Sequence, residues 1–216
     1  MKIIITESQY KLILENEEYL GQIMELIETF DETNIDIAFQ IAKGLKIKQS
    51  TILGHYEELF KLFKYKPSVI NLKKIIKKTN LDVDINLSKT TIDLIFNLPN
   101  LKTINFFRLN SDLDDLVSTN KQLYITNRCK ITSLPNLMSV GDLYYAHSKI
   151  TSLPKLKEVE YDLGLDNTDI ESLPNLISVG GDLMLTNTPL GKELKDSGMS
   201  EDEIKNKFGV KGELFI

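Results

Sequence analysis

Residues 131–143 read ITSLPNLMSVGDL, and this stretch decides the fold because the chain repeats it twice. Residues 150–163 read ITSLPKLKEVEYDL, and residues 170–183 read IESLPNLISVGGDL. The leucines that close these segments continue an earlier one, since Leu123, Leu143, Leu163 and Leu183 are each 20 residues apart. A fixed period of this length is typical of a solenoid, in which every repeat forms one coil.

A short alternating run follows each closing leucine: LYYAHSKI at 143–150, LGLDNTDI at 163–170 and LMLTNTPL at 183–190. Alternation places every second side chain on the same face of a strand. We therefore predict adjacent parallel strands at 123–127, 143–147, 163–167 and 183–187. Inside each turn a small side chain must hydrogen-bond the backbone, because buried polar groups need partners. The residues expected in that role are Ser148, Thr168, Thr188 and Cys129.

These runs resemble the leucine-rich-repeat pattern L-x-L-x-x-N/C-x-L, with Ser or Thr where that pattern usually has Asn. More narrowly, LPNLxSVGGDLxLxNT resembles repeats of bacterial and bacteriophage proteins, and the SVGGDL start also resembles receptor L-type repeats. The resemblance covers residues 81–216 and implies an α/β leucine-rich-repeat solenoid with one parallel β-sheet. It implies little about function, because such folds bind many unrelated partners.

Weaker copies flank the regular ones. Residues 85–92 fit the strand template, residues 98–104 fit the connecting arc, and residues 107–116 form an irregular repeat. At the other end, residues 210–216 (VKGELFI) mirror residues 179–185 (VGGDLML). The sequence thus predicts six strands and a truncated seventh.

The two ends are expected to cap the solenoid. Residues 1–80 lack the repeat and have helical patterns: a Thr6 and Gln9 capping box, an apolar stripe at 35–45 with Gly44 as an internal weakness or a stop, and amphipathic stretches at 56–63 and 69–76. We predict a helical N-terminal capping domain at 1–80 and a solenoid at 81–216. Within the solenoid, a helix capped by Ser200 and a last strand form a C-terminal cap at 191–216. Whether residues 1–80 are also a second binding site stays open.

Composition narrows the function. The formal net charge of −5 gives no overall basic field, which argues against nucleic acid as the partner. The sequence has no apolar stretch long enough for a membrane span and no secretory segment, so we expect no membrane association. The single cysteine, Cys129, rules out an internal disulfide framework. The expected location is the cytoplasm, which is the host cytoplasm if the phage resemblance reflects the source.

Little in the sequence suggests catalysis. It has no nucleophile motif, P-loop or GxGxxG element, and its only histidines are His55 and His147. We expect a non-enzymatic protein without cofactor or metal. The aligned acids Asp142, Asp162 and Asp182 would suit a glycosidase pair or a calcium site, but backbone hydrogen bonding at the start of each strand is favoured. The lysines of 73–78 are expected on a solvated helix face, with a phosphate-binding patch as the alternative.

The outward face of the sheet is the expected binding surface. One outward column contains Tyr124, Tyr144, Gly164, Met184 and Phe215, and the next contains Thr126, Ala146, Asp166 and Thr186. Exposed tyrosine and methionine with neighbouring acids suit an interface with an apolar centre, so we expect a protein partner with a basic surface. A structural virion or assembly component and a carbohydrate-binding protein stay open as alternatives. The predicted partner-binding residues are Tyr124, Asp142, Tyr144, His147, Asp162, Asp166, Asp182 and Met184.

Overall fold

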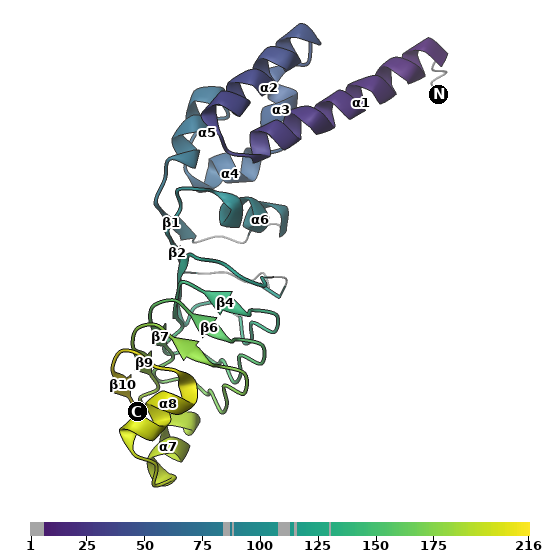
Figure 1. The fold of residues 1–216 in the computed structure, drawn as a ribbon. Coiled ribbons are helices and arrows are strands. Elements are labelled where there is room, and N and C mark those ends of the chain that lie inside the picture. Colours follow the sequence, from purple (N-terminus) through teal and green to yellow (C-terminus); the bar gives the residue numbers. More distant parts are fainter. Residues whose placement is uncertain (1–6, 84–86, 88, 108–112, 115, 130) are drawn as a thin grey trace. The chain divides into compact units, whose positions relative to one another are not determined.

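The structure is a computed structural model that describes residues 7–83, 87, 89–107, 113–114, 116–129 and 131–216, without the side chains of 7–17 and Lys89. The chain divides into two compact units. One contains residues 1–78 with 93–100, and the other contains residues 79–92 with 101–216. The first is helical and the second is built mainly from parallel strands (Figure 1).

The first unit contains five complete helices: α1 (Glu7–Glu28), α2 (Glu32–Gly44), α3 (Gln49–Gly54), α4 (Glu57–Leu62) and α5 (Val69–Ile76). Helix α2 begins after Asp31, whose side chain accepts hydrogen bonds from the Thr33 and Asn34 N–H groups, and it ends at Gly44, which is therefore a stop and not an internal weakness. Ile35 is buried in α2, but Ile37 is 41% exposed. The predicted stripe is therefore too wide, because two residues along a helix is more than half a turn. Thr6 of the predicted capping box lies outside the described residues.

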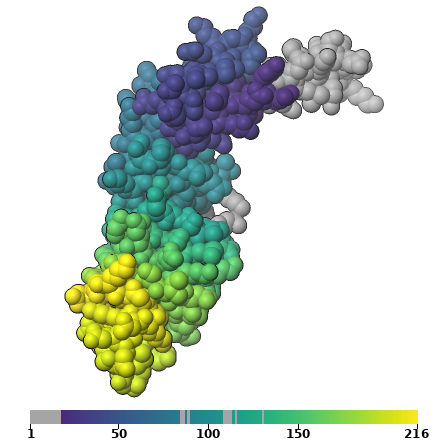
Figure 2. Space-filling model, in the orientation of Figure 1, coloured from purple at the N-terminus to yellow at the C-terminus, as the bar shows by residue number. Residues whose placement is uncertain are grey.

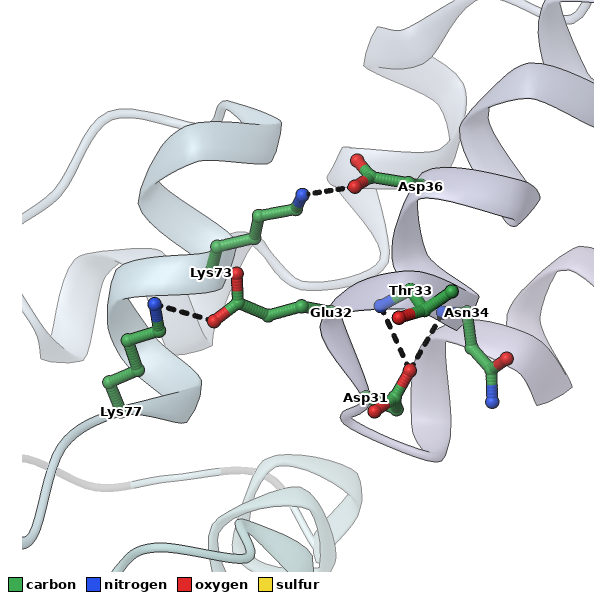
Figure 3. Close-up of polar contacts among 7 residues, drawn as sticks. All are labelled: Asp31, Glu32, Thr33, Asn34, Asp36, Lys73 and Lys77. Carbon is green, nitrogen blue, oxygen red and sulfur yellow. Dashed lines mark hydrogen bonds and ion pairs between the residues drawn. The ribbon is translucent and has the colours of Figure 1, made fainter.

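Two ion pairs join α2 to α5 (Figure 3). The Lys73 ammonium lies 2.6 Å from the Asp36 carboxylate, and the Lys77 ammonium lies 2.5 Å from the Glu32 carboxylate. Partners in each helix are four residues apart, so they project from one face. The prediction of a solvated helix face is therefore wrong for Lys73, whose side chain is only 23% exposed and faces α2.

The second unit contains a seven-stranded parallel sheet with the order β1-β2-β3-β5-β7-β9-β10. Leu123, Leu143, Leu163 and Leu183 lie side by side in it, which confirms the predicted parallel strands. The strands are shorter than predicted because the chain turns soon after each outward residue. Their bounds are β1 (Asn80–Val83), β2 (Thr103–Phe106), β3 (Gln122–Ile125), β5 (Asp142–Tyr144), β7 (Leu163–Gly164), β9 (Leu183–Met184) and β10 (Leu214–Phe215).

A second parallel sheet, which the sequence did not predict, lies on the connecting arcs. It consists of β4 (Ser139–Val140), β6 (Glu158–Val159) and β8 (Ser178–Val179). Each regular coil thus contributes a short strand to two sheets, and the coils stack into a β-solenoid (Figure 1). On the face that Figure 2 shows, the coils pack against each other without a gap.

The first two strands lie elsewhere than predicted. Residues 89–92 of the expected first strand belong to helix α6 (Lys89–Asn97), while Ile85 and Asn86 lie outside the described residues. The first strand is instead β1, where Leu81 and Val83 are buried and Asn80 and Asp82 are exposed. The predicted arc at 98–104 overlaps strand β2, which starts at Thr103. Most of the irregular repeat expected at 107–116 lies outside the described residues.

The solenoid core consists of the inward apolar side chains of successive coils. Leu134 and Leu153 are fully buried and Leu173 is 4% exposed, as predicted. The hydroxyl groups in the turns, or corners, after the strands also form the expected hydrogen bonds with the backbone. Thr168 donates to the Leu165 carbonyl at 2.7 Å, and Thr188 donates to the Leu185 carbonyl at 2.7 Å. These bonds satisfy carbonyls that no strand partner reaches, which keeps the tight corners free of unpaired polar groups.

Small side chains also bond the backbone at the other two corners, but one of them bonds the preceding coil and not its own. The Ser148 hydroxyl donates to the Tyr145 carbonyl of its own coil at 2.9 Å. The Cys129 thiol instead donates to the Phe106 carbonyl of the preceding coil at 3.2 Å. A buried aromatic residue adds a further bond, because the Tyr145 hydroxyl donates to the Ile131 carbonyl.

The C-terminal end is closed by helices α7 (Pro189–Asp196) and α8 (Glu201–Phe208) and by β10. Ser200 and Glu203 form a capping box at the start of α8, as the sequence predicted for Ser200. Gly209 ends α8 with a φ of 60°, and a Cβ there would meet the Ile177 carbonyl oxygen. Glycine is therefore required where the chain turns back toward the sheet.

Replacement of Leu153 by Ala tests the core. We expect the change to lower the free energy of unfolding by about 2 to 5 kcal/mol, because a fully buried leucine leaves a cavity. Urea denaturation followed by circular dichroism measures the loss, with the exposed neighbour change Lys155→Ala as the control. A loss below about 0.5 kcal/mol would show that Leu153 is not a core residue.

Charge reversal tests the contact between α2 and α5. We expect Lys73→Glu to destabilise the helical unit by roughly 0.5 to 1 kcal/mol, because the new carboxylate faces Asp36. The reciprocal variant Asp36→Lys with Lys73→Glu should regain most of that loss. Lys74→Glu changes the same charge on an exposed neighbour and is the matched control. Thermal melts of helical circular dichroism report all three variants, and the absence of any rescue would contradict the pairing.

Candidate partner-binding surface

A ladder of aspartates links the coils at the start of their strands. Asp142 Oδ1 accepts a hydrogen bond from the Asp162 N–H at 2.7 Å, and Asp162 Oδ1 accepts one from the Asp182 N–H at 2.8 Å. Asp182 Oδ1 in turn accepts from the Glu213 N–H at 2.8 Å. One oxygen of each carboxylate therefore holds the backbone of the next coil, which is the role that the sequence favoured over an acid/base pair.

The three aspartates differ in how far they are exposed to solvent. Asp142 is only 4% exposed, so the expectation that it faces a partner is wrong. Asp162 and Asp182 are half-buried and keep part of their carboxylates at the surface. Within the described ranges, no group of three or more His, Cys, Asp or Glu residues is placed to hold a metal ion.

Two tyrosines stack on the outward side of the sheet. The ring centroids of Tyr124 and Tyr144 are 4.8 Å apart, and the ring planes differ by 3°. Neighbouring parallel strands have nearly this spacing, so side chains at one register position can stack without distortion. The sequence indicated that both tyrosines are outward, but alternation alone does not predict the ring angles.

The position of Tyr144 is fixed from two sides. Its hydroxyl donates to Asp162 Oδ2 at 2.6 Å. Its ring lies over Gly164 in the next strand, where an added Cβ would come within 2.7 Å of Tyr144 Cδ1. Gly164 therefore leaves the space that the ring occupies, and Asp162 anchors the hydroxyl. Tyr144 is held before any partner arrives.

The same surroundings keep both phenols protonated. Burial, the hydrogen bond to Asp162 and the nearby carboxylate charges raise the pKa of Tyr144 above its ordinary value. Burial also raises the pKa of Tyr124, with further contributions from Asp142 and Asp162. Both rings therefore stay neutral at physiological pH.

The remaining predicted residues surround this pair. Met184 is half-buried in the same register column, and Phe215 is 46% exposed at its end. Asp166 is half-buried, and its Oδ1 accepts from the Thr186 N–H at 2.9 Å. We call the outward residues Tyr124, Tyr144, Asp162, Asp166, Asp182 and Met184 the sheet face.

His147 lies at the turn that follows β5, beside the sheet face. It is exposed and has a φ of 56°, as have Asn167 and Asn187 at the same position of the next two coils. The Asn187 amide donates to Asn167 Oδ1 at 3.0 Å, so these turns form a polar edge. The left-handed backbone accounts for Asn at this position, since Asn adopts it more readily than most residues.

Sequence reasoning missed a buried lysine next to this surface. Lys121 directly precedes β3 and is 4% exposed, and its ammonium donates to the Leu101 carbonyl at 2.8 Å. Burial lowers its pKa. A lysine in a polar stretch between two repeats carries no pattern that would indicate burial, so the sequence held no signal for it.

The charge of the surface follows from these positions. The sheet face carries three carboxylates, and Glu213, directly before β10, continues the column of Asp162 and Asp182. The Lys205 ammonium offsets part of this charge, because it lies 3.5 Å from the Glu213 carboxylate and 2.9 Å from that of Glu201. The surface thus combines apolar contact area with an excess of negative charge, and it can accept hydrogen bonds from cationic groups.

No helix in the described part of the chain is long and apolar enough to cross a membrane. Comparison with known proteins finds no family model, no curated protein and no solved structure that matches the chain.

Proposed function

We propose that the chain is a non-enzymatic interaction module of the leucine-rich-repeat type, which binds a basic protein partner on its sheet face. The observation that carries this proposal is the stacked pair Tyr124 and Tyr144, held at the surface by Asp162 and Gly164. A solenoid that served only as a scaffold would have no need to fix two aromatic side chains there.

The fixed tyrosines favour binding for a physical reason. Tyrosine offers a large amphipathic contact area, and ordering its two side-chain torsions costs little entropy. Here the hydrogen bond to Asp162 and the stacking have already ordered Tyr144, so a partner does not bear that cost again. Aromatic anchors of this kind commonly dominate the binding energy of an interface.

The carboxylates of the sheet face favour a partner with a basic surface. Asp162, Asp166 and Asp182 each engage one oxygen with a backbone N–H, which leaves their negative charge in place on the surface. A basic partner gains from this field mainly in association rate and in selectivity. The negative charge also favours a basic partner over a neutral carbohydrate on this face, because a neutral ligand gains nothing from the field.

The leucine-rich-repeat assignment rests on the corner residues. Thr168 and Thr188 bond the backbone of their own turns from the position where the family pattern has Asn. The inward leucines of the repeat support it as well. We further propose a cytoplasmic location, because the sequence has a single cysteine, Cys129, and therefore cannot form the internal disulfides that are typical of proteins in oxidising compartments.

Selection from a displayed random-peptide library against the full chain tests the sheet face. We expect the enriched peptides to combine Arg or Lys with an apolar side chain. Tyr144→Ala should weaken the best peptide by at least about 2 kcal/mol, or roughly thirtyfold, as for a central aromatic anchor. Tyr144→Phe keeps the ring and loses only the bond to Asp162, so its effect should be smaller.

The charge of the sheet face is tested separately with Asp166→Asn combined with Asp182→Asn. These amides keep an oxygen that accepts the Thr186 and Glu213 N–H bonds while removing two charges. We expect the association rate to fall roughly tenfold at low salt and the difference to vanish near 1 M salt, where screening is nearly complete. Lys74→Glu on α5 is the control. Normal binding by the sheet-face variants together with loss of binding by Lys74→Glu would place the active surface in the helical unit.

A further inference from the structure

We propose that a polar groove at the start of strands β1 to β3 binds a neutral oligosaccharide. The groove has a volume of about 530 Å³, within the range of small-molecule sites. It lies wholly within the solenoid unit and does not include the sheet face, so this proposal is independent of the function proposed above. The groove is lined by Thr79, Asn80, Lys102, Thr103, Asn120, Gln122, Glu160 and Tyr161.

The coil of Gly141, which lies between the two sets of lining residues, contributes no side chain at this position. Gly141 lies at the repeat position between Lys121 and Tyr161, and the Tyr161 N–H donates to its carbonyl at 2.9 Å. A Cβ on Gly141 would lie 2.6 Å from the Asn120 carbonyl oxygen, so no larger residue fits. The lining residues Asn120 and Gln122 thus belong to the coil before that of Gly141, and Glu160 and Tyr161 belong to the coil after it.

Tyr161 supplies an aromatic surface on one wall. It is 51% exposed, although a tyrosine in a solenoid coil gains no stability from an exposed ring. The carboxylate of the neighbouring Glu160 raises the pKa of Tyr161. The ring itself is half exposed and can contact a ligand. The negative face of an aromatic ring attracts weakly positive groups such as the C–H groups of a sugar ring.

The opposite wall supplies paired donors and acceptors. Asn80 and Asn120 are exposed amides, each with an acceptor oxygen and two N–H donors. The Thr103 hydroxyl donates to Gln122 Oε1 at 2.9 Å, which leaves the amide nitrogen of Gln122 to donate to a ligand. A sugar hydroxyl donates one hydrogen bond and accepts others, so neighbouring hydroxyls match such amides.

The net charge of the groove lining favours a neutral ligand over a charged one. The lining contains one carboxylate, from Glu160, and one ammonium group, from Lys102. These charges cancel, so the groove has no field that would select a phosphate, a sulfate or a polycation. A ligand with many hydroxyls, an apolar ring face and no net charge satisfies all the groups that line it.

A glycan array tests the proposal with the full chain as the labelled protein. The array carries neutral hexose and N-acetylhexosamine oligosaccharides together with sulfated and sialylated ones. We expect binding to neutral glycans only. Tyr161→Ala should weaken that binding at least about tenfold, as the loss of an aromatic anchor does, and Asn120→Ala should weaken it measurably.

Matched controls separate the groove from the rest of the chain. Tyr19→Ala removes another exposed tyrosine from α1, and Asn127→Ala removes another exposed amide near the other end of β3; both should bind like the unchanged protein. Tyr144→Ala on the sheet face should also leave glycan binding unchanged. An array without any signal, binding to charged glycans only, or binding that survives both Tyr161→Ala and Asn120→Ala would overturn the proposal.

Discussion

The hydrogen bond from the backbone of a coil to an aspartate of the preceding coil is the interaction on which the regular part of the solenoid depends. Asp142, Asp162 and Asp182 make this bond in succession, and the last one docks the chain before β10. Strands as short as two residues make few ladder bonds of their own. The carboxylates add a charged acceptor at the start of each strand, and charge-assisted bonds are stronger than neutral ones. They fix the register in which the leucines stack.

Asp162 shows how this framework and the surface are joined. One oxygen holds the backbone of Asp182 and the other accepts from the Tyr144 hydroxyl. The side chain that sets the spacing of two coils therefore also sets the position of the aromatic ring above them. A change at Asp162 would affect stability and surface together, whereas Tyr124 and Met184 are free to vary without disturbing the coils.

The sequence predicted the regular half of the solenoid well, because there the period repeats three times and the inward leucines are unambiguous. Prediction failed at the first two strands, because helix α6 interrupts the repeat and β1 and β2 match the template only weakly. Local pattern could not separate a strand from a helix here, since Ile92 and Leu94 have the spacing of a strand while Ile92 and Ile95 have that of an amphipathic helix.

The candidate surface was predictable in part for a similar reason. Alternation indicated that Tyr124, Tyr144 and Met184 face outward, but it could not reveal that Asp142 is buried or that Tyr144 lies over Gly164. The groove beside Tyr161 depends on residues about 80 positions apart along the chain, from Thr79 to Tyr161, that only the stacking of coils brings together. Because the stacked contacts are equivalent from one coil to the next, the number of coils can change in evolution. Asp182 meets Glu213 as Asp162 meets Asp182, so a duplicated coil finds the same donors above and below it. The array can therefore lengthen or shorten by whole coils while both ends stay intact, and its outer surface can gain or lose a row of side chains in a single genetic event.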